Sequence, residues 1–320
     1  MSAVSKIMFI RRCTSLSSQA PISRKDTNPS YPMYILDKLT MCADICKNNG
    51  IDKMIYLGDL FNSSSLSQGT YLGTCWIHLL GLGIDQYTIT GNHEIPYYNE
   101  KSFEGTVLDI TYKTGIVKHL DRLELDNDVV VHGLDFGKPF EPIQKDGKYH
   151  ICVAHAFYEN DFYGKGVDNL KAVDANRLGY DAYVLGHDHT PYAMVTENNY
   201  KVIRPGSLTR GTSKTCNLYR KVQVAVFDTL FKTWEEIEIP VKPGEEVFKE
   251  RRFIEKQQQS VDLDKIIHNL YAPEKNSIYK IIKSDSEPAK LAMKDNYNEV
   301  ISLITKYLES HGIYDMEVKQ

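Results

Sequence analysis

The sequence predicts a layered α/β domain, on the basis of three observations. Short apolar runs rich in β-branched residues recur between residues 6 and 227. A stretch of helical periodicity separates the first two runs. Several runs end directly at Gly, Asp, Asn or His, as expected where an α/β sheet binds its ligands. The predicted strands are residues 6–10, 54–57, 86–90, 129–132, 149–154, 182–185, 201–203 and 222–227.

The helix predicted between the first two strands spans residues 34–47. Its apolar side chains recur at the spacing of one helical face, which indicates a helix packed on a sheet. These side chains are Ile35, Leu36, Leu39, Cys42, Ile45 and Cys46.

The chain is predicted to contain two domains, residues 1–240 and 245–320. The segment 240–246 (PVKPGEE) has the composition of a linker. Beyond it, the patterns predict an apolar periodic stretch near 261–270, a short strand at 278–282 and an amphipathic helix at 297–309. We therefore expect a small C-terminal α/β cap.

Composition is that of an ordinary globular protein. Of the 320 residues, 42% are hydrophobic and 25% charged, and the net charge is −4. The absence of a basic surplus weakens a prediction of DNA binding without excluding it. No Cys-x-x-Cys pair occurs, which argues against a zinc ribbon or a redox dithiol and favours a reducing environment. With no secretory signal and no long apolar run, the sequence predicts a cytoplasmic protein that does not bind a membrane.

Four short signals begin where predicted strands end. Each alone is weak, because a Gly-Asp pair is usually a turn and a single His is usually structural. Their occurrence in one order, each after an apolar strand, favours a functional site. The glycines that precede three of the polar residues would let the backbone turn tightly beneath the site. The signals are Gly58-Asp59-Leu60-Phe61, Gly91-Asn92-His93-Glu94, the single His155, and Gly186-His187-Asp188-His189.

These residue types suit a metal centre. Imidazole nitrogens and hard oxygens together favour manganese, iron or zinc over calcium or magnesium. The carboxylate of Asp59 can bridge two metals, and two metals about 3.5–4 Å apart can clamp a phosphate and activate a water.

The combination of signals resembles the signature of the calcineurin-like metallophosphoesterases over about residues 6–228. The resemblance implies a two-sheet sandwich flanked by helices, with a dinuclear manganese-type site. It implies that Asp59 bridges the metals, that one metal is held by Asn92, His155 and His187, and that the other is held in part by His189.

The resemblance also assigns catalytic and structural roles. His93 would lie beside the phosphate and protonate the leaving oxygen, whereas Asp188 matches a variable position and would be structural. A narrower similarity involves GHDHTP, the segment Arg204-Pro-Gly-Ser-Leu-Thr-Arg and the short cap. These features are similar to the SbcD-type nuclease subunit of DNA-break repair complexes, including its phage members.

The sequence departs from this family after its first strand. The family has Asp-x-His there, whereas this chain has Cys13 and Ser15 at the corresponding places, with Arg11 and Arg12 beside them. Neutral Ser is a poor ligand, and two guanidinium groups repel a dication. One metal site is therefore expected to be damaged.

A local frameshift is one explanation for this departure. The codons AGG CGA TGT ACA TCT encode Arg-Arg-Cys-Thr-Ser. Read one base later, the same bases encode Gly-Asp-Val-His and begin a Leu codon, which restores the family opening. The alternative is a genuine loss of one metal site.

Three functions remain open at this stage. The first is a DNA exonuclease or endonuclease of recombination and repair that works with an SbcC-type ATPase, with a homodimer as one arrangement. The second is a phosphodiesterase or phosphatase of small molecules. The third is a non-catalytic subunit that has lost one metal. Fold alone does not decide among them.

Overall fold

The computed structural model describes residues 6–11, 24–25, 30–65, 69–96, 99–159, 169–197, 200–211 and 215–248. The chain divides into two compact units, residues 1–250 and 251–320. All described residues belong to the first unit. The elements expected in the cap, at 261–270, 278–282 and 297–309, lie outside them, and the domain boundaries stay a prediction.

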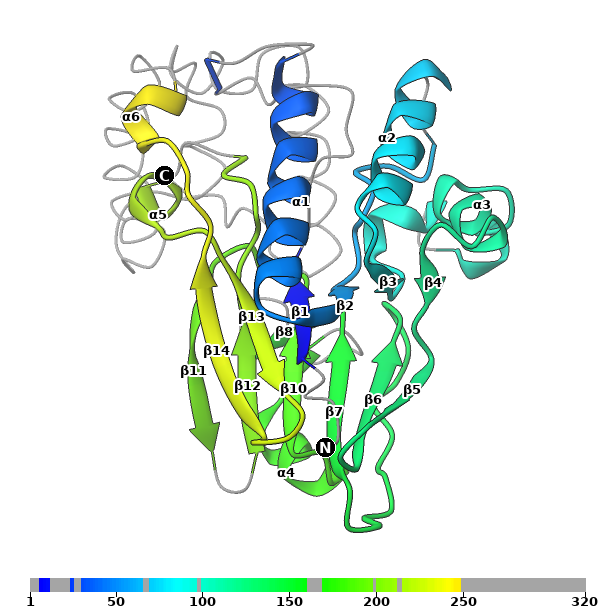
Figure 1. Cartoon of the computed structure of the whole chain (residues 1–320). Coiled ribbons are helices and arrows are strands. Elements are labelled where there is room, and N and C mark those ends of the chain that lie inside the picture. Colours follow the sequence, from blue (N-terminus) through cyan, green and yellow to red (C-terminus); the bar gives the residue numbers. More distant parts are fainter. Residues whose placement is uncertain are drawn as a thin grey trace, which may run out of the picture. The chain divides into compact units, whose positions relative to one another are not determined.

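The first sheet has six strands, and its four consecutive strands β1, β2, β3 and β4 are parallel (Figure 1). Strand β13 joins β1 in the antiparallel sense, and β14 completes that edge. The order is β14 (Thr233–Glu238), β13 (Gln223–Asp228), β1 (Lys6–Ile10), β2 (Ile51–Tyr56), β3 (Asp85–Thr88) and β4 (Lys118–His119).

The second sheet also has six strands, of which the central four are parallel. Its order is β11 (Tyr192–Glu197), β12 (Tyr200–Arg204), β10 (Ala182–Leu185), β7 (Tyr149–Ala154), β6 (Val129–Leu134) and β5 (Arg122–Leu125). A separate pair is formed by β8 (Phe157–Tyr158) and β9 (Asn169–Leu170).

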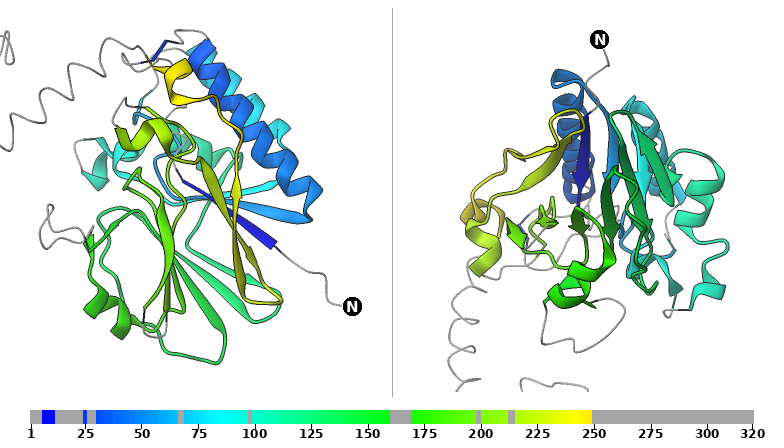
Figure 2. Two further views of the ribbon diagram at one scale, coloured as in Figure 1. Left: turned by 90° about the vertical axis from the view of Figure 1, so that its left-hand side faces the viewer. Right: turned by 90° about the horizontal axis from the view of Figure 1, so that it is seen from below.

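Helices cover the outer faces of both sheets (Figure 2). Three of them pack on the first sheet: α1 (Ser30–Asn48), α2 (Gly69–Gly81) and α3 (Val107–Lys113). Helix α4 (Ala172–Leu178) packs on the second sheet. The remaining short helices are η1 (Asn92–Glu94), η3 (Glu100–Ser102), α5 (Thr215–Tyr219) and α6 (Gly244–Val247).

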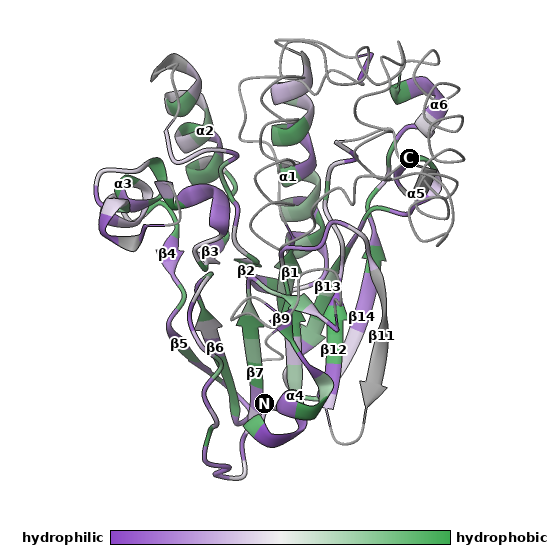
Figure 3. Ribbon diagram, turned by 180° about the vertical axis from the view of Figure 1, so that it is seen from behind, coloured by the Kyte–Doolittle hydropathy of each residue, from purple (hydrophilic) through white to green (hydrophobic). Residues whose placement is uncertain are grey.

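The core between the sheets explains why the central strands are continuously apolar. In β1, Ile7 and Phe9 face the second sheet, whereas Met8 and Ile10 face the helices. A strand buried on both faces requires apolar residues at every position. Figure 3 shows the contrast with the edge strand β14, which is largely hydrophilic. The predicted α/β two-sheet sandwich flanked by helices is therefore confirmed.

Strands that are buried on both faces were predicted well, and edge strands were not. Strands β1, β7 and β10 have the predicted bounds, and α1 extends the predicted helix at both ends. The predicted linker is partly helical, because α6 begins at Gly244 and is followed by buried Phe248. The described cysteines Cys42, Cys46, Cys75 and Cys152 are buried thiols. No described helix is long and apolar enough to cross a membrane.

Candidate metal centre

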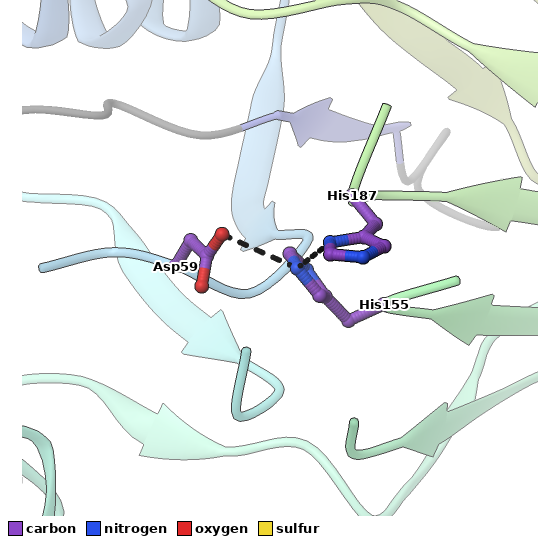
Figure 4. A group of neighbouring side chains, drawn as sticks. All are labelled: Asp59, His155 and His187. Carbon is purple, nitrogen blue, oxygen red and sulfur yellow. Dashed lines mark hydrogen bonds and ion pairs between the residues drawn. The ribbon is translucent and has the colours of Figure 1, made fainter. Parts of the chain in front are cut away.

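Four predicted ligands lie at the carboxyl ends of four strands from the two sheets. Asp59 follows β2 and Asn92 follows β3 in the first sheet, whereas His155 follows β7 and His187 follows β10 in the second. Since the strands of each pair are parallel neighbours, their carboxyl ends lie together. Figure 4 shows Asp59, His155 and His187 pointing toward one another.

His155 Nε2 is at the centre of this group. It lies 3.2 Å from Asp59 Oδ2, 3.1 Å from Asn92 Oδ1 and 3.1 Å from His187 Nδ1. One ligand atom from each of Asp59, His155 and His187 lies within 4.8 Å of the others, the one such group of His, Cys, Asp and Glu in the described part of the chain. Asp59 and His155 are buried, and His187 is half-buried.

The hydrogen bonding of His155 fits a metal ligand. Its Nδ1 lies 2.7 Å from the carbonyl oxygen of Leu57, and a carbonyl can only accept, so Nδ1 carries the hydrogen. In the neutral ring the lone pair is then on Nε2, which faces Asp59 Oδ2, Asn92 Oδ1 and His187 Nδ1. A backbone carbonyl that orients a ligating imidazole in this way is a common feature of metal sites. The donor set of this chain therefore fits a divalent metal.

Two of the candidate ligands have strained backbones. Asp59 has a φ of 54° and His187 a φ of 72°, in the left-handed region that side-chain-bearing residues rarely adopt. Such conformations persist where surrounding structure imposes them, and they concentrate at functional sites. Here they turn the chain sharply at the end of a strand.

His93 is attached to the same group through its backbone. Its N–H donates to Asp59 Oδ1 at 2.9 Å, and its ring Nδ1 lies 3.0 Å from the carbonyl oxygen of Asn62. The carbonyl requires a hydrogen on Nδ1, which leaves Nε2 as the nitrogen that exchanges a proton. The ring is therefore oriented by a contact that is independent of the metal ligands.

His189 is not part of the four-residue group. It is half-buried in the loop after β10, where its carbonyl accepts from the N–H of Ser207. Asp188 pairs with Arg204 at 3.0 Å, and its Oδ1 also accepts from the N–H of Thr190. Asp188 thus holds the loop that carries His187 and His189 against the end of β12, as a structural residue would.

Glu94 is a functional residue that the sequence analysis left without a role. Its side chain is fully buried and accepts from three backbone N–H groups, those of Asp59, Phe61 and Gly91. Burial and the neighbouring carboxylate of Asp59 raise the pKa of Glu94 to about 8. The signal for it was present, because a carboxylate directly follows Gly91-Asn92-His93.

Two aromatic side chains beside the histidines were also missed. The ring of Phe157 lies 4.1 Å from that of His187, and the ring of Phe136 lies 5.6 Å from His187 and 6.1 Å from His155. These rings pack beside the two histidines of the group. Sequence alone did not mark them, because each is an ordinary apolar residue in its segment.

The end of β1 differs from the other strand ends. Arg11 is fully buried and forms an isolated parallel bridge with Ser207, while its carbonyl accepts from Leu208. The guanidinium of Arg11 is therefore buried directly after β1. The family resemblance implies a metal ligand two residues later, at the position of Cys13. Cys13 and Ser15 lie outside the described residues, so the predicted loss of one metal site stays a prediction.

Replacement of Glu94 by Gln is expected to lower the free energy of unfolding by about 1–3 kcal/mol. Above pH 8, where Glu94 is ionised, the amide NH₂ group would face a backbone N–H that donates to the carboxylate in the unchanged protein, so one buried donor loses its acceptor. Chemical denaturation measures the loss. Glu104→Gln is the control, because Glu104 is exposed and its contact with Lys113 is 4.0 Å. Equal stability of the two variants would contradict the role of Glu94 as the acceptor of three backbone hydrogen bonds.

Gly91→Ala should displace the carboxylate of Asp59. A Cβ at Gly91 would overlap both the backbone nitrogen and Oδ1 of Asp59. We expect weaker manganese binding by calorimetry and a loss of stability. Gly73→Ala, within α2, is the control, since a Cβ there meets nothing within 4 Å. Unchanged manganese affinity in Gly91→Ala would show that Asp59 does not need this close approach.

One family of known proteins matches the part of the chain that carries this site. The model of the family described as calcineurin-like phosphoesterase matches residues 34–191. Similar solved structures include a hypothetical protein from Thermus thermophilus (TM-score 0.39, 12% identity, 73% of this chain and 100% of that chain covered). They also include a dimetal phosphatase from Danio rerio (TM-score 0.45, 11% identity, 75% and 100% covered). No curated protein sequence matches significantly.

The matched segment contains Asp59, Asn92, His93, His155, His187 and His189. It begins within α1 and ends just after the loop that carries His187. Residues 34–191 of this chain therefore match the calcineurin-like phosphoesterase family, and they include the candidate metal centre.

Proposed function

We propose that this protein is a metal-dependent phosphodiesterase that cleaves DNA, in partnership with an SbcC-type ATPase. The observation that carries the proposal is the convergence of Asp59, Asn92, His155 and His187, with the backbone of His93 bonded to Asp59. The family match supports a hydrolase that acts on phosphoesters. DNA as the substrate and the ATPase partner are the further steps of the proposal.

The case for DNA comes from segments that resemble the SbcD-type nucleases. The loop of His187 and His189 and the segment 204–210 are separated in the sequence but are in contact in the fold. Arg204 pairs with Asp188, and the N–H of Ser207 donates to the carbonyl of His189. Arg210 in turn donates to the carbonyls of Leu218 and Lys242. The resembling residues thus form one connected structure beside the metal centre.

The roles of the side chains follow from their contacts. A bound divalent metal, for which we propose manganese, would supply a Lewis acid for the phosphate oxygens and lower the pKa of a water. His155 is locked by Leu57 with Nε2 toward the group, and His93 is oriented through Asn62. We assign His93 the task of giving a proton to the leaving oxygen, with Nε2 as the donating atom.

One observation favours a second candidate, a subunit with reduced or absent catalysis. Arg11 is buried at the end of β1, and its positive charge opposes the binding of a cation nearby. A small-molecule phosphodiesterase is the other alternative, since the same ligands suit any phosphoester. Manganese-supplemented assays on linear DNA and on bis(p-nitrophenyl) phosphate distinguish the nuclease, the small-molecule phosphodiesterase and the non-catalytic subunit. Cleavage of DNA at a higher kcat/KM supports the proposal, whereas cleavage of the small ester alone contradicts it.

His93→Ala is expected to lower kcat by a factor of about 10²–10⁴ while the manganese content stays unchanged. The N–H that donates to Asp59 is a backbone group and survives the substitution. His78→Ala is the control, because His78 is a half-buried histidine of α2 that contacts Thr40 and lies outside the candidate metal centre. Steady-state kinetics and metal analysis give both readouts, and full turnover by His93→Ala would refute the role of proton donor.

Replacement of Arg11–Ser15 by Gly-Asp-Val-His should raise manganese-dependent activity strongly. It removes two cations and adds one carboxylate and one imidazole after β1, where Asp59 and His189 would complete a second site. Metal analysis should find about one tightly bound ion in each unchanged chain and about two in each chain of the variant. Equal activity and equal metal content of the two proteins would contradict the account of a damaged site.

The frameshift hypothesis makes a separate claim about the gene. Its codons for residues 11–15 should read Gly-Asp-x-His when shifted by one base. Codons that cannot do so would eliminate the frameshift and leave a genuine loss of ligands as the explanation.

A further inference from the structure

A cavity lies beside the candidate metal centre and has no role in the chemistry described so far. Its volume is about 360 Å³, within the range of small-ligand sites. Four of its eight lining residues are aromatic or apolar, and the other four are Thr90, Lys138 and the His119–Asp135 ion pair. The lining residues used in the argument are Ile95, Phe103, Tyr112, His119, Asp135 and Phe136.

The cavity and the metal centre share a wall. Phe136 lines the cavity, and its ring also packs near the rings of His155 and His187. Thr90 lines the cavity as well and is two residues before Asn92. The N–H of Phe136 donates to the carbonyl of Thr90 at 2.9 Å, so wall and ligand loop are held together. A molecule with its phosphate at the metal centre has this cavity as its neighbour.

The aromatic side chains present flat surfaces and edges to the cavity. The rings of Phe103 and Tyr112 are 6.2 Å apart, and that of Tyr112 meets His119 edge-on at 5.1 Å. Phe103 is half-buried, so part of its ring is available to a ligand. Side chains of this kind bind planar rings by stacking, and such stacking is tolerant of which base is bound.

A polar group lies at a defined place among these rings. The two carboxylate oxygens of Asp135 lie 3.0 and 3.1 Å from His119 Nε2, and Oδ1 also accepts from the N–H of Thr90 at 2.7 Å. The hydrogen bond that His119 donates to Asp135 raises the pKa of His119. The pair therefore gives the cavity a polar side that can meet the hydrogen-bonding edge of a ligand.

We propose that this cavity binds the base of the nucleotide whose phosphate lies at the metal centre. The base stacks against Phe103 and Phe136, and its polar edge meets the Asp135–His119 pair. This inference rests on the proposed function, since it names the part of a DNA substrate that the same site recognises. It predicts that a base is bound next to the phosphate without strong preference for one base over another.

Equilibrium binding tests the inference without relying on turnover. Calorimetry in manganese compares thymidine 5′-monophosphate with 2-deoxyribose 5-phosphate, which carries the same phosphate and no base. We expect the nucleotide to bind about tenfold tighter, a difference of about 1.4 kcal/mol. Phe103→Leu, which keeps an apolar side chain and removes the ring, should bring the ratio of the two dissociation constants toward one.

The control variant is Phe231→Leu, which makes the same change at an exposed phenylalanine between β13 and β14. It should leave the ratio at the wild-type value. A second measurement needs no variant: saturation transferred from the protein should be stronger on the base protons of the nucleotide than on its sugar protons.

Each outcome decides between the proposals. Equal affinities of the two phosphates, or stronger transfer to the sugar, would overturn the base-binding cavity. An unchanged ratio in Phe103→Leu would do the same. A tenfold preference for the nucleotide in a protein that cleaves no DNA would support the cavity and count against the nuclease. Cleavage of DNA by a protein that binds the two phosphates equally tightly would support the nuclease and count against the base-binding cavity.

Discussion

The hydrogen bond between His155 and the carbonyl of Leu57 joins the two sheets at the metal centre. His155 follows β7 of the second sheet and Leu57 follows β2 of the first, 98 residues earlier. A side chain at Gly186 would overlap the same carbonyl, so β10 also approaches this point closely. The bond fixes which nitrogen of His155 faces Asp59, Asn92 and His187. The ligand group therefore exists only when both halves of the sandwich are correctly packed.

Electrostatics explains why such a group favours a cation. Asp59 and Glu94 are two buried carboxyl groups close enough that each disfavours ionisation of the other. Three backbone N–H groups stabilise the charge of Glu94 in part, but the cost of placing two carboxylates together in the interior remains. A divalent ion among Asp59, His155 and His187 would offset that cost. The buried Arg11 places a fixed positive charge, that of its side chain, at the end of β1.

The fold and the positions of the candidate ligands could be inferred from the sequence for a common reason. Central strands such as β7 and β10 are apolar throughout because both faces are buried, and the polar residue that ends each is conspicuous. In edge strands such as β14, charged residues are interspersed with apolar ones, so the residue that ends the strand does not stand out. Glu94 and Phe136 were missed because their importance depends on contacts across the sandwich. The sequence offers no pattern that places Phe136 beside His155.

The central claim is that Asp59, Asn92, His155 and His187 hold one divalent metal. Crystals grown with manganese, with diffraction data collected at the manganese absorption edge, test it most directly. The account predicts an anomalous peak in contact with Asp59, Asn92 Oδ1, His155 Nε2 and His187. Manganese located away from these four residues, in a protein with an intact sandwich, would contradict it.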